Sequence, residues 1–478
     1  MQQLTGLDAS FLAMETTTAT GHVGGVCVLD PSEAPHELDL AALTDLMADR
    51  IPLVPVMRRK LLHVPLGLDQ PYWIDDRDFD LEYHIRELAL PRPGSDAQLC
   101  EQVARLHARP LDRSRPLWEI YLITGLDAGR IAVYTKIHHA AIDGVSGAEL
   151  LTVLLDLSPD GRELPESKPF APAAPPHRAL LAARATARLA WRPVETARIA
   201  RDLVRAIPTL APALSPLVGG VLGLNRGDGS VISTSLGRAP ATPFNKAITA
   251  HRRFAIRSVD LGTVKRVKNT FGVSVNDVVM AMCAGALRTW LSERDALPET
   301  PLVAMIPVSV RDDSAKGKLG NRVSSMLAVL PTNVADPRQR LVVVHEATKV
   351  AKAQQAAIPQ GLVDDISDFA PPALVARAAR VVFATGLLHR LPPFNLTISN
   401  VPGPNVPVYL GGAKLLAEYP VSVITDGQGL NITVVGYLGR LHFGLIACRE
   451  LVPDVDVLAG YLSDELDILA EAADRVEA

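Results

Sequence analysis

Two adjacent histidines, His138 and His139, are the residues whose types and spacing point most directly to chemistry. Asp143 and Gly144 follow His139 by four and five residues, which gives the pattern His-His-x-x-x-Asp-Gly. A neutral imidazole has an unperturbed pKa of about 6.5, so it can remove a proton from a hydroxyl group near neutral pH. General-base assistance accelerates such a step by roughly 10²–10⁴-fold. One of the two histidines is therefore a candidate general base.

The residues on either side of the pair predict a strand followed by a helix. Residues 131–135 are an apolar run typical of a buried strand, and residues 145–155 have apolar side chains at helical spacing. Asp143 and Gly144 then lie at the turn between them. Neighbouring residues of an extended chain point to opposite faces, so one imidazole can enter the core while the other faces an open channel. Asp143 can stiffen this turn, and Gly144 allows close chain approach or a positive φ.

Other interpretations of the same pattern stay open. Asp143 can be no more than a helix N-cap, and both histidines can be hydrogen-bonded core residues. His138, His139 and Asp143 are also residue types that bind metals. Opposite-face geometry keeps two adjacent histidines from reaching one ion, so we expect no metal.

Length and composition limit the number of domains, the kinds of partner and the cellular compartment that we expect. A chain of 478 residues is long enough for two domains, and its net charge of −4 gives no reason to expect nucleic acid. The four cysteines form no C-x-x-C pair, so we expect free thiols in a reducing compartment. The first residues do not resemble a signal peptide, and the long uncharged run 207–225 is broken by proline and glycine. We therefore expect a cytoplasmic protein.

Strand and helix patterns alternate twice across a linker, which predicts α/β domains at 1–160 and 243–478 joined by a Pro/Ala/Arg-rich helical linker at 161–242. The strands expected in the first domain are 23–29, 72–74 continued by 79–85, 118–124 and 131–137. Its expected helices are 38–50 and 96–108. The strands expected in the second domain are 253–258, 302–310, 324–330, 394–400, 421–425, 431–437 and 441–448. Its expected helices are 258–270 (capped by Ser258), 274–294 (capped by Ser274), one beginning at Asp336-Pro337, and 454–472.

The linker contains a basic segment. Residues 177–206 include seven arginines and two acids, and an uncharged Pro/Gly-rich run follows to residue 224. A basic amphipathic helix can lie on an anionic membrane surface. The alternative is a plain connector that reflects the Arg- and Ala-rich composition of the whole chain. We expect peripheral, salt-sensitive attachment to a membrane or lipid droplet without insertion.

Five motifs in order along the chain resemble those of one family. The His-His-x-x-x-Asp-Gly pattern resembles the HHxxxDG motif of the CoA-dependent acyltransferase superfamily, which includes chloramphenicol acetyltransferase and the condensation domains. The other four resemble the opening, PLW, ND and SNVPGP segments of the bacterial wax ester synthase/diacylglycerol acyltransferase family; they are residues 4–11, 115–119, 275–279 and 398–404. The resemblance implies two chloramphenicol-acetyltransferase-like domains with mixed sheets and an active-site channel between them.

The resemblance also implies residue roles. His139 corresponds to the general base, His138 to a packing or orienting residue, and Asp143 to a structural residue that pairs with an arginine, for which Arg311 is a weak candidate. Oxyanion or substrate contacts can come from Ser399 and Asn400, at a strand end before a rigid turn, or from Asn276 and Asp277. The first pair can instead be ordinary turn residues. Ser274 and Asp277 resemble a capping box. Residues 116–118 carry no reactive group, so we expect them to pack beneath the site.

The implied reaction is direct transfer of an acyl group from a long-chain acyl-CoA to diacylglycerol, and possibly to a fatty alcohol. Coenzyme A thiolate is a good leaving group and no G-x-S-x-G elbow is present, so no covalent acyl-enzyme and no cofactor are expected. Two alternatives remain. One is a same-fold transferase that uses a carrier-protein thioester or a polyketide alcohol. The other is a lipid-surface protein that has lost activity.

Overall fold

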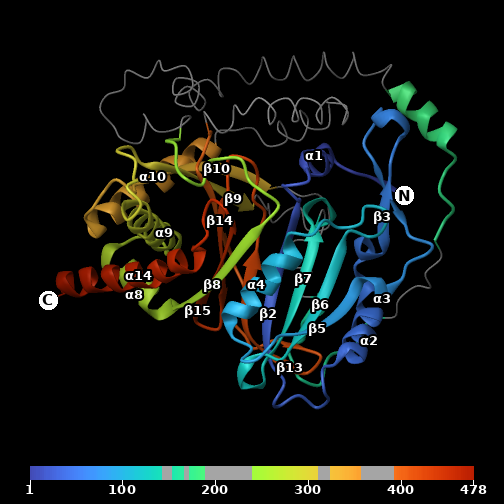
Figure 1. Ribbon diagram of the computed structural model, residues 1–478, viewed down its shortest axis with the longest axis horizontal. Coiled ribbons are helices and arrows are strands. Elements are labelled where there is room, and N and C mark those ends of the chain that lie inside the picture. The colour runs from blue at the N-terminus through green and yellow to red at the C-terminus, as the bar shows by residue number, and fades with distance from the viewer. Residues whose placement is uncertain (143–152, 166–171, 189–238, 310–322, 357–391, 478) are drawn as a thin grey trace.

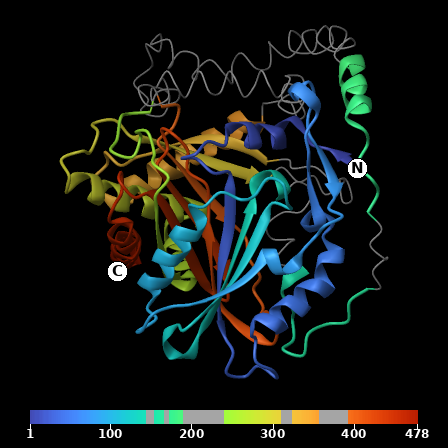
Figure 2. The ribbon, with the colours of Figure 1, turned by 45° about the vertical axis from the view of Figure 1, so that its right-hand side comes forward.

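The computed structural model describes residues 1–142, 153–165, 172–188, 239–309, 323–356 and 392–477 (Figure 1). These residues form two six-stranded sheets, one three-stranded sheet and the helices that cover them. The two large sheets lie beside each other at the centre, and most helices lie on their outer sides (Figures 1 and 2). The predicted mixed α/β architecture is confirmed.

The first large sheet carries the histidine motif. Its strand order is β12-β13-β2-β7-β6-β5, and only the β5–β6 pair is parallel. The strands are β12 Tyr409–Leu410, β13 Ala413–Val421, β2 His22–Asp30, β7 Ile131–His138, β6 Trp118–Thr124 and β5 Ile85–Ala89. The register places His22 directly opposite His138, so these two imidazoles share one face of the sheet.

The helices of the first half pack around this sheet and around a small sheet ordered β1-β4-β3. The helices are α1 Gly6–Met14, α2 Leu40–Arg50, α3 Leu81–His84 and α4 Asp96–His107. The small sheet consists of β1 Gln2–Gln3, β4 Tyr72–Asp75 and β3 Arg59–Leu62. The 3₁₀ turns are η1 Ile51–Leu53, η2 Pro55–Arg58, η3 Pro65–Gly67, η4 Asp127–Gly129 and η5 His139–Ile142. Helix α1 packs on η5, the turn that begins at His139.

The second large sheet has the order β10-β9-β11-β14-β15-β8, with β9, β11 and β14 parallel. Its strands are β10 Val323–Leu330, β9 Leu302–Ser309, β11 Leu396–Val401, β14 Leu430–Tyr437, β15 Arg440–Cys448 and β8 Arg252–Asp260. Its helices are α8 Leu261–Phe271, α9 Val275–Ser292, α10 Pro337–Ala356 and α14 Val455–Glu477. Helix α9 is buried along most of its length and forms the centre of this core.

The two halves of the chain share strands. Strands β12 and β13 belong to the predicted second domain by sequence, yet they extend the first sheet, with β13 pairing along β2. Strand β13 also packs on β14 and β15, and α4 packs on β8. An apolar cluster between the sheets includes Val26, Tyr134, Phe254 and Ile446. The predicted boundaries at 160 and 243 stay predictions, but the two halves are joined by pairing and packing that those boundaries do not anticipate.

Two predicted strands are wrong. Residues 79–85 were expected to be extended, but Asp80 accepts a hydrogen bond from the Tyr83 N–H and starts the helical turn α3, so the strand begins only at Ile85. The strand expected at 421–425 instead runs over 413–421 and ends at Val421. A third correction concerns a cap: Asp260, not Ser258, caps α8, because Ser258 is still within β8.

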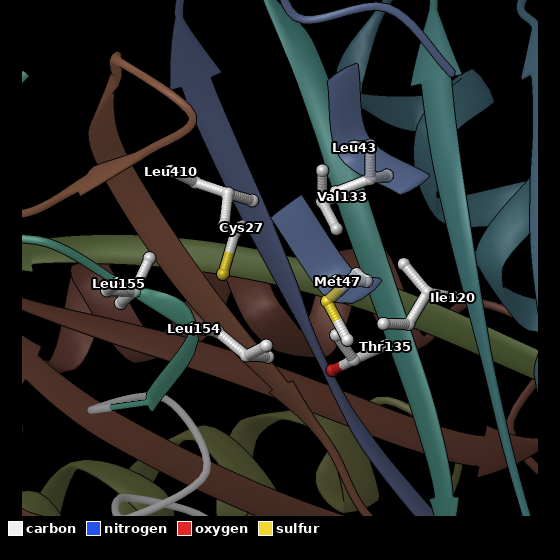
Figure 3. Close-up of a pocket in the computed structure, with 9 residues that line it drawn as sticks. All are labelled: Cys27, Leu43, Met47, Ile120, Val133, Thr135, Leu154, Leu155 and Leu410. Atoms are coloured by element: carbon white, nitrogen blue, oxygen red, sulfur yellow. The ribbon is translucent and has the colours of Figure 1, made fainter. Parts of the chain in front are cut away.

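An apolar cavity lies inside the first half (Figure 3). It is enclosed by β2, β7, β6, α2 and the segment at 154–155, and the side chains that line it include Cys27, Met47, Val133 and Leu154. The cavity holds no more than about one water-sized molecule. It is therefore a packing defect of the core and too small for an acyl chain. The channel expected between the domains stays a prediction.

No single helix in the described ranges is long and apolar enough to cross a membrane. Helices α8 and α9 meet the length and composition test only when taken together, across a bend of 103°. All four cysteines, Cys27, Cys100, Cys283 and Cys448, are buried free thiols, as predicted.

Candidate active site

The histidine pair lies where β7 ends. His138 is the last residue of the strand and His139 is the first of the 3₁₀ turn η5. The main chain is held on both sides: the His138 N–H donates to the Leu117 carbonyl (2.9 Å) and the His139 N–H donates to the Gly21 carbonyl (2.8 Å). The Ala140 N–H then donates to Nδ1 of His138 (3.1 Å). The main-chain hydrogen bonds of His138, His139 and Ala140 thus fix the position of His139.

The His139 ring is half-buried and stacks on Phe11 of α1, with ring centroids 4.0 Å apart and an interplanar angle of 22°. Its Nδ1 atom is buried and hydrogen-bonds to no other described residue. Burial lowers the pKa of His139, and its own main-chain carbonyl opposes this shift in part. The imidazole is therefore neutral at physiological pH, as a proton acceptor must be.

The His138 ring is almost fully buried, with 1% of its surface exposed. It lies against Gly21, where a Cβ atom would be 2.7 Å from Nε2, so a larger residue at position 21 would displace the ring. Burial lowers the pKa of His138 to about 3; the nearby Glu15 carboxylate opposes the shift, and His22 and Arg113 add to it. His138 stays neutral and has no access to solvent, which suits an orienting residue better than a base.

A carboxylate lies beside the buried histidines. Glu15 is 3.5 Å from Nε2 of His22 and 3.9 Å from Nε2 of His138. Arg113 binds it through Nε (2.7 Å) and through Nη2, which also donates to the Leu12 carbonyl. Burial opposes ionisation of Glu15, but the interaction with His22 and the charge of Arg113 lower its pKa to about 2. A permanent negative charge thus faces the buried side of the motif.

A second buried ion pair joins Lys136 of β7 to Glu119 of β6. Lys136 Nζ donates to Glu119 Oε2 (3.0 Å) and to the carbonyls of Leu106 and Arg109 at the end of α4. Trp118, in the same segment as Glu119, is buried, and its Nε1 donates to the Met57 carbonyl (2.7 Å). The packing role predicted for residues 116–118 is confirmed for Trp118.

Asn276 and Asp277 lie at the start of α9. Ser274 and Asp277 form the predicted capping box, with hydrogen bonds of 2.9 and 3.1 Å between each side chain and the other residue's main-chain N–H. Oδ2 of Asp277 also lies 2.9 Å from Nδ1 of His345 in α10. Asn276 is half-buried in the same turn. These partners occupy Oδ2, whereas Oδ1 is buried and has no hydrogen bond to a described residue, and the role of Asp277 as a substrate contact stays a prediction.

Ser399 and Asn400 are half-buried near the end of β11, opposite Thr433 and Val434 of β14. The turn that follows presses against β14, because a Cβ atom at Gly403 would be 2.2 Å from the Gly436 carbonyl oxygen. The glycine of this motif is thus required for close packing. Oxyanion contacts by Ser399 and Asn400 stay predictions.

Three residues with predicted roles, Asp143, Gly144 and Arg311, lie outside the described residues. Within the part of the chain that is described, no group of three or more His, Cys, Asp or Glu side chains could hold a metal ion. Sequence reasoning missed Phe11, Glu15, His22 and Arg113 as neighbours of the histidine pair. One signal was present: Phe11 and Glu15 are four residues apart, which places them on one side of a helix.

The chain is similar to known proteins over its whole length. Residues 4–279 match the wax ester synthase/diacylglycerol acyltransferase catalytic domain, and residues 319–470 match the WS/DGAT C-terminal domain. A putative diacylglycerol O-acyltransferase of Mycobacterium tuberculosis is 36% identical over 476 residues, which cover 99% of this chain and 91% of that protein. The O-acyltransferase WSD of Acinetobacter baylyi is 34% identical over 475 residues, covering 98% and 97%.

Solved structures agree. The wax ester synthase/diacylglycerol acyltransferase from Marinobacter aquaeolei VT8 is 32% identical, with a TM-score of 0.70 over 99% of this chain and all of that one. The first condensation domain of the CDA synthetase is 17% identical with a TM-score of 0.55 over 99% and 96%, which shows a shared fold. The motifs, the fold and the extent of these matches together show that the chain belongs to the wax ester synthase/diacylglycerol acyltransferase family.

Proposed function

We propose that this chain is an O-acyltransferase that moves the acyl group of a long-chain acyl-CoA to the hydroxyl of diacylglycerol or a long-chain alcohol, with His139 as general base. Family membership supports the reaction class. The observation that carries the residue assignment is the state of His139, whose ring is neutral, half-buried and stacked on Phe11, in contrast to the fully buried His138.

The proposed step needs only groups that the chain and its substrates supply. The alcohol oxygen attacks the thioester carbon while Nε2 of His139 takes the hydroxyl proton, which gives a tetrahedral oxyanion and an imidazolium. Collapse of the oxyanion breaks the carbon–sulfur bond and forms the ester. The CoA thiolate takes the proton from the imidazolium, so the products are the ester and CoA thiol, and His139 is neutral again.

The direct test is product analysis with purified protein. Radiolabelled palmitoyl-CoA is supplied with dioleoylglycerol in one reaction and with hexadecanol in another, and the lipids are separated. We expect labelled triacylglycerol, wax ester or both, and no label in either product with His139→Ala. Unchanged product formation by the variant would overturn the assignment of the base. Absence of both products from the parent protein, with labelled fatty acid released instead, would overturn the acyltransferase function.

We also propose that the enzyme works on the cytoplasmic side of a lipid surface, attached peripherally through its linker. Only part of the predicted segment 177–224 is described: residues 178–188 are helical. This helix buries Leu181 and Ala185 and exposes Arg178, Arg184 and Leu180. Arg188, in contrast, lies 3.2 Å from Asp69 and also binds Gln3, so its charge is already used within the protein.

A second feature adds apolar contact beside this helix. The loop between β3 and β4 lies next to residues 178–188 in both views (Figures 1 and 2). Leu66 in this loop has a positive φ of 58° and 88% of its surface exposed. A large apolar side chain beside two unburied arginines suits an anionic lipid surface, where each basic residue contributes about 1 kcal/mol.

Vesicle binding tests this attachment. Arg178→Gln with Arg184→Gln should weaken co-sedimentation with phosphatidylglycerol vesicles about 30-fold at low salt, and Leu66→Asp should add to the loss. Turnover of a short-chain, soluble substrate pair should not change. The matched control is Leu157→Asp, because Leu157 is also a leucine with 76% of its surface exposed. If the triple variant sediments like the parent protein, the helix is a plain connector.

A further inference from the structure

Helix α1 brings two side chains to the two histidines. Phe11 in its second turn stacks on His139, and Glu15, the residue at its C-terminal cap, faces His138 and His22. Four residues separate Phe11 from Glu15, so both project from the same side of the helix. One element thus contacts the proposed base and the residue before it.

The hydrogen bond at Nδ1 of His138 defines the tautomer of this ring. Nδ1 accepts from the Ala140 N–H, so it carries a lone pair, and the proton of the neutral ring is on Nε2. Nε2 is buried and hydrogen-bonds to no described residue, and the charged group that faces it is Glu15 at 3.9 Å. This separation is too long for a hydrogen bond but close enough for a negative charge to favour a proton at Nε2 in a buried site.

The charge of Glu15 is maintained by its surroundings. Arg113 binds one carboxylate oxygen through two nitrogens and ties itself to the Leu12 carbonyl of α1. The other carboxylate oxygen lies 3.5 Å from His22, whose ring is 6.0 Å from that of His138. Glu15 therefore stays ionised between two neutral imidazoles.

The tautomer matters because it shapes the turn that carries the base. If the His138 proton moved to Nδ1, that atom would face the Ala140 N–H as a second donor, and the turn would lose a hydrogen bond immediately after His139. A buried donor left without its acceptor is unfavourable. The turn would then shift His139 relative to Phe11 and to the substrate hydroxyl.

We propose that Glu15 is a positioning residue for catalysis: its carboxylate fixes the Nε2–H tautomer of His138 and thereby holds the turn that carries His139. This role rests on the proposed function of His139 as base. Glu15 does not touch substrate or accept the proton. Its contribution is to keep the proton acceptor in place.

The test combines a spectroscopic and a kinetic measurement. Histidine is labelled with ¹⁵N, the His138 signals are assigned by their loss in His138→Asn, and long-range ¹H–¹⁵N spectra report the tautomer. We expect Nε2–H for His138 in the parent protein and a mixture with Nδ1–H in Glu15→Gln. The variant should lose about 10- to 100-fold in kcat with nearly unchanged KM for acyl-CoA. Glu15→Asp, which keeps the charge, should recover part of the rate.

Glu465→Gln is the matched control. Glu465 is the buried carboxylate partner of Arg340 in the second half, so its loss also strands an arginine but far along the chain from the histidines. It should lower the melting temperature and leave kcat and the His138 tautomer unchanged. A folded Glu15→Gln protein that keeps Nε2–H, or a kcat within twofold of the parent, overturns the proposal.

Two further outcomes separate the hypotheses. If Glu15→Gln does not fold, an Nδ1–H tautomer of His138 in the parent protein still overturns the proposal, and Nε2–H together with partial activity of Glu15→Asp supports it. If Glu15→Gln changes the tautomer while His139→Ala keeps full activity, Glu15 acts on His138 as inferred and the base assignment is what fails.

Discussion

Two carboxylate–histidine pairs, one in each half of the chain, show different uses of the same groups. In the second half, Asp277 and His345 lie 2.9 Å apart, and the same carboxylate closes the capping box of α9. In the first half, Glu15 lies 3.5 and 3.9 Å from His22 and His138, and both imidazoles retain buried nitrogens without hydrogen bonds to described residues. In the second half, Oδ2 of Asp277 is hydrogen-bonded to His345 and Ser274, although its Oδ1 is buried and has no hydrogen bond to a described residue. In the first half, neither imidazole is hydrogen-bonded to Glu15.

The difference separates stability from function. A buried polar group without a partner costs free energy, so it persists only where the surrounding structure holds it in place. Arg113, Gly21 and α1 provide that support around His138. Around α9, by contrast, the core is apolar and the polar groups end a helix. The imidazoles beside Glu15 lie close to a charged carboxylate without hydrogen-bonding to it, unlike His345, and we expect the first half to be the reactive one.

The largest expected effect is on the rate and is confined to the first half. His139→Ala should lower kcat by at least about 10²–10⁴-fold, because the general base is removed. His138→Ala should retain measurable activity, and His345→Ala should keep the parent rate. Kinetics with palmitoyl-CoA, with circular dichroism melting as a control for folding, check this order. Equal losses at positions 138 and 139 with unchanged melting would contradict a single base.

The next effect concerns stability at low pH. Burial lowers the pKa of His138 to about 3, whereas the unfolded chain titrates near 6.5. The unfolded state therefore binds the extra proton first, so the contribution of the neutral ring is full above pH 6.5 and is lost as pH falls from 6.5 to about 3. Glu15, with a pKa lowered to about 2, extends this loss at still lower pH.

His138→Gln should reduce the loss of stability on acidification. Between pH 6.5 and 4 the unfolding free energy of the parent should fall faster than that of the variant, by up to about 1.4 kcal/mol per pH unit. Urea unfolding at several pH values measures both slopes. Parallel slopes would mean that His138 is not a buried neutral group.

The sequence predicted the local elements well because most strands are apolar runs bounded by turn residues. It failed at 79–85, where one side chain, Asp80, caps a helical turn inside an apparently extended stretch. It also failed to show that β13 joins the first sheet, because the alternation within a strand does not specify its neighbour. Long-range pairing of this kind depends on the whole fold.

In the candidate site, too, local patterns were predicted from the sequence and long-range contacts were not. The histidine pair and the helix cap at Ser274 are local patterns and were found. Glu15 and Arg113 are separated by 98 residues, and nothing in the local sequence links them to each other or to His138. Only the packing of α1 on η5 brings them together. Asp143 and Gly144 belong to the predicted motif but lie outside the described residues, so their roles stay predictions.

The smallest expected effect is on stability and concerns the pair in the second half, Asp277 and His345. Asp277→Ala removes the capping box and the contact with His345, so it should lower the unfolding free energy by about 1 kcal/mol. Burial raises the pKa of Asp277, but His345 and Ser274 lower it below its usual value, so this contribution is present above about pH 4 and declines at lower pH.

Ser274→Ala is the matched control, because it removes one cap hydrogen bond and keeps the carboxylate. If Asp277 only caps the start of α9, both variants melt earlier and keep the parent kcat/KM. If Asp277 contacts the substrate, kcat/KM falls in Asp277→Ala alone, and the division between a reactive first half and a structural second half would have to be abandoned.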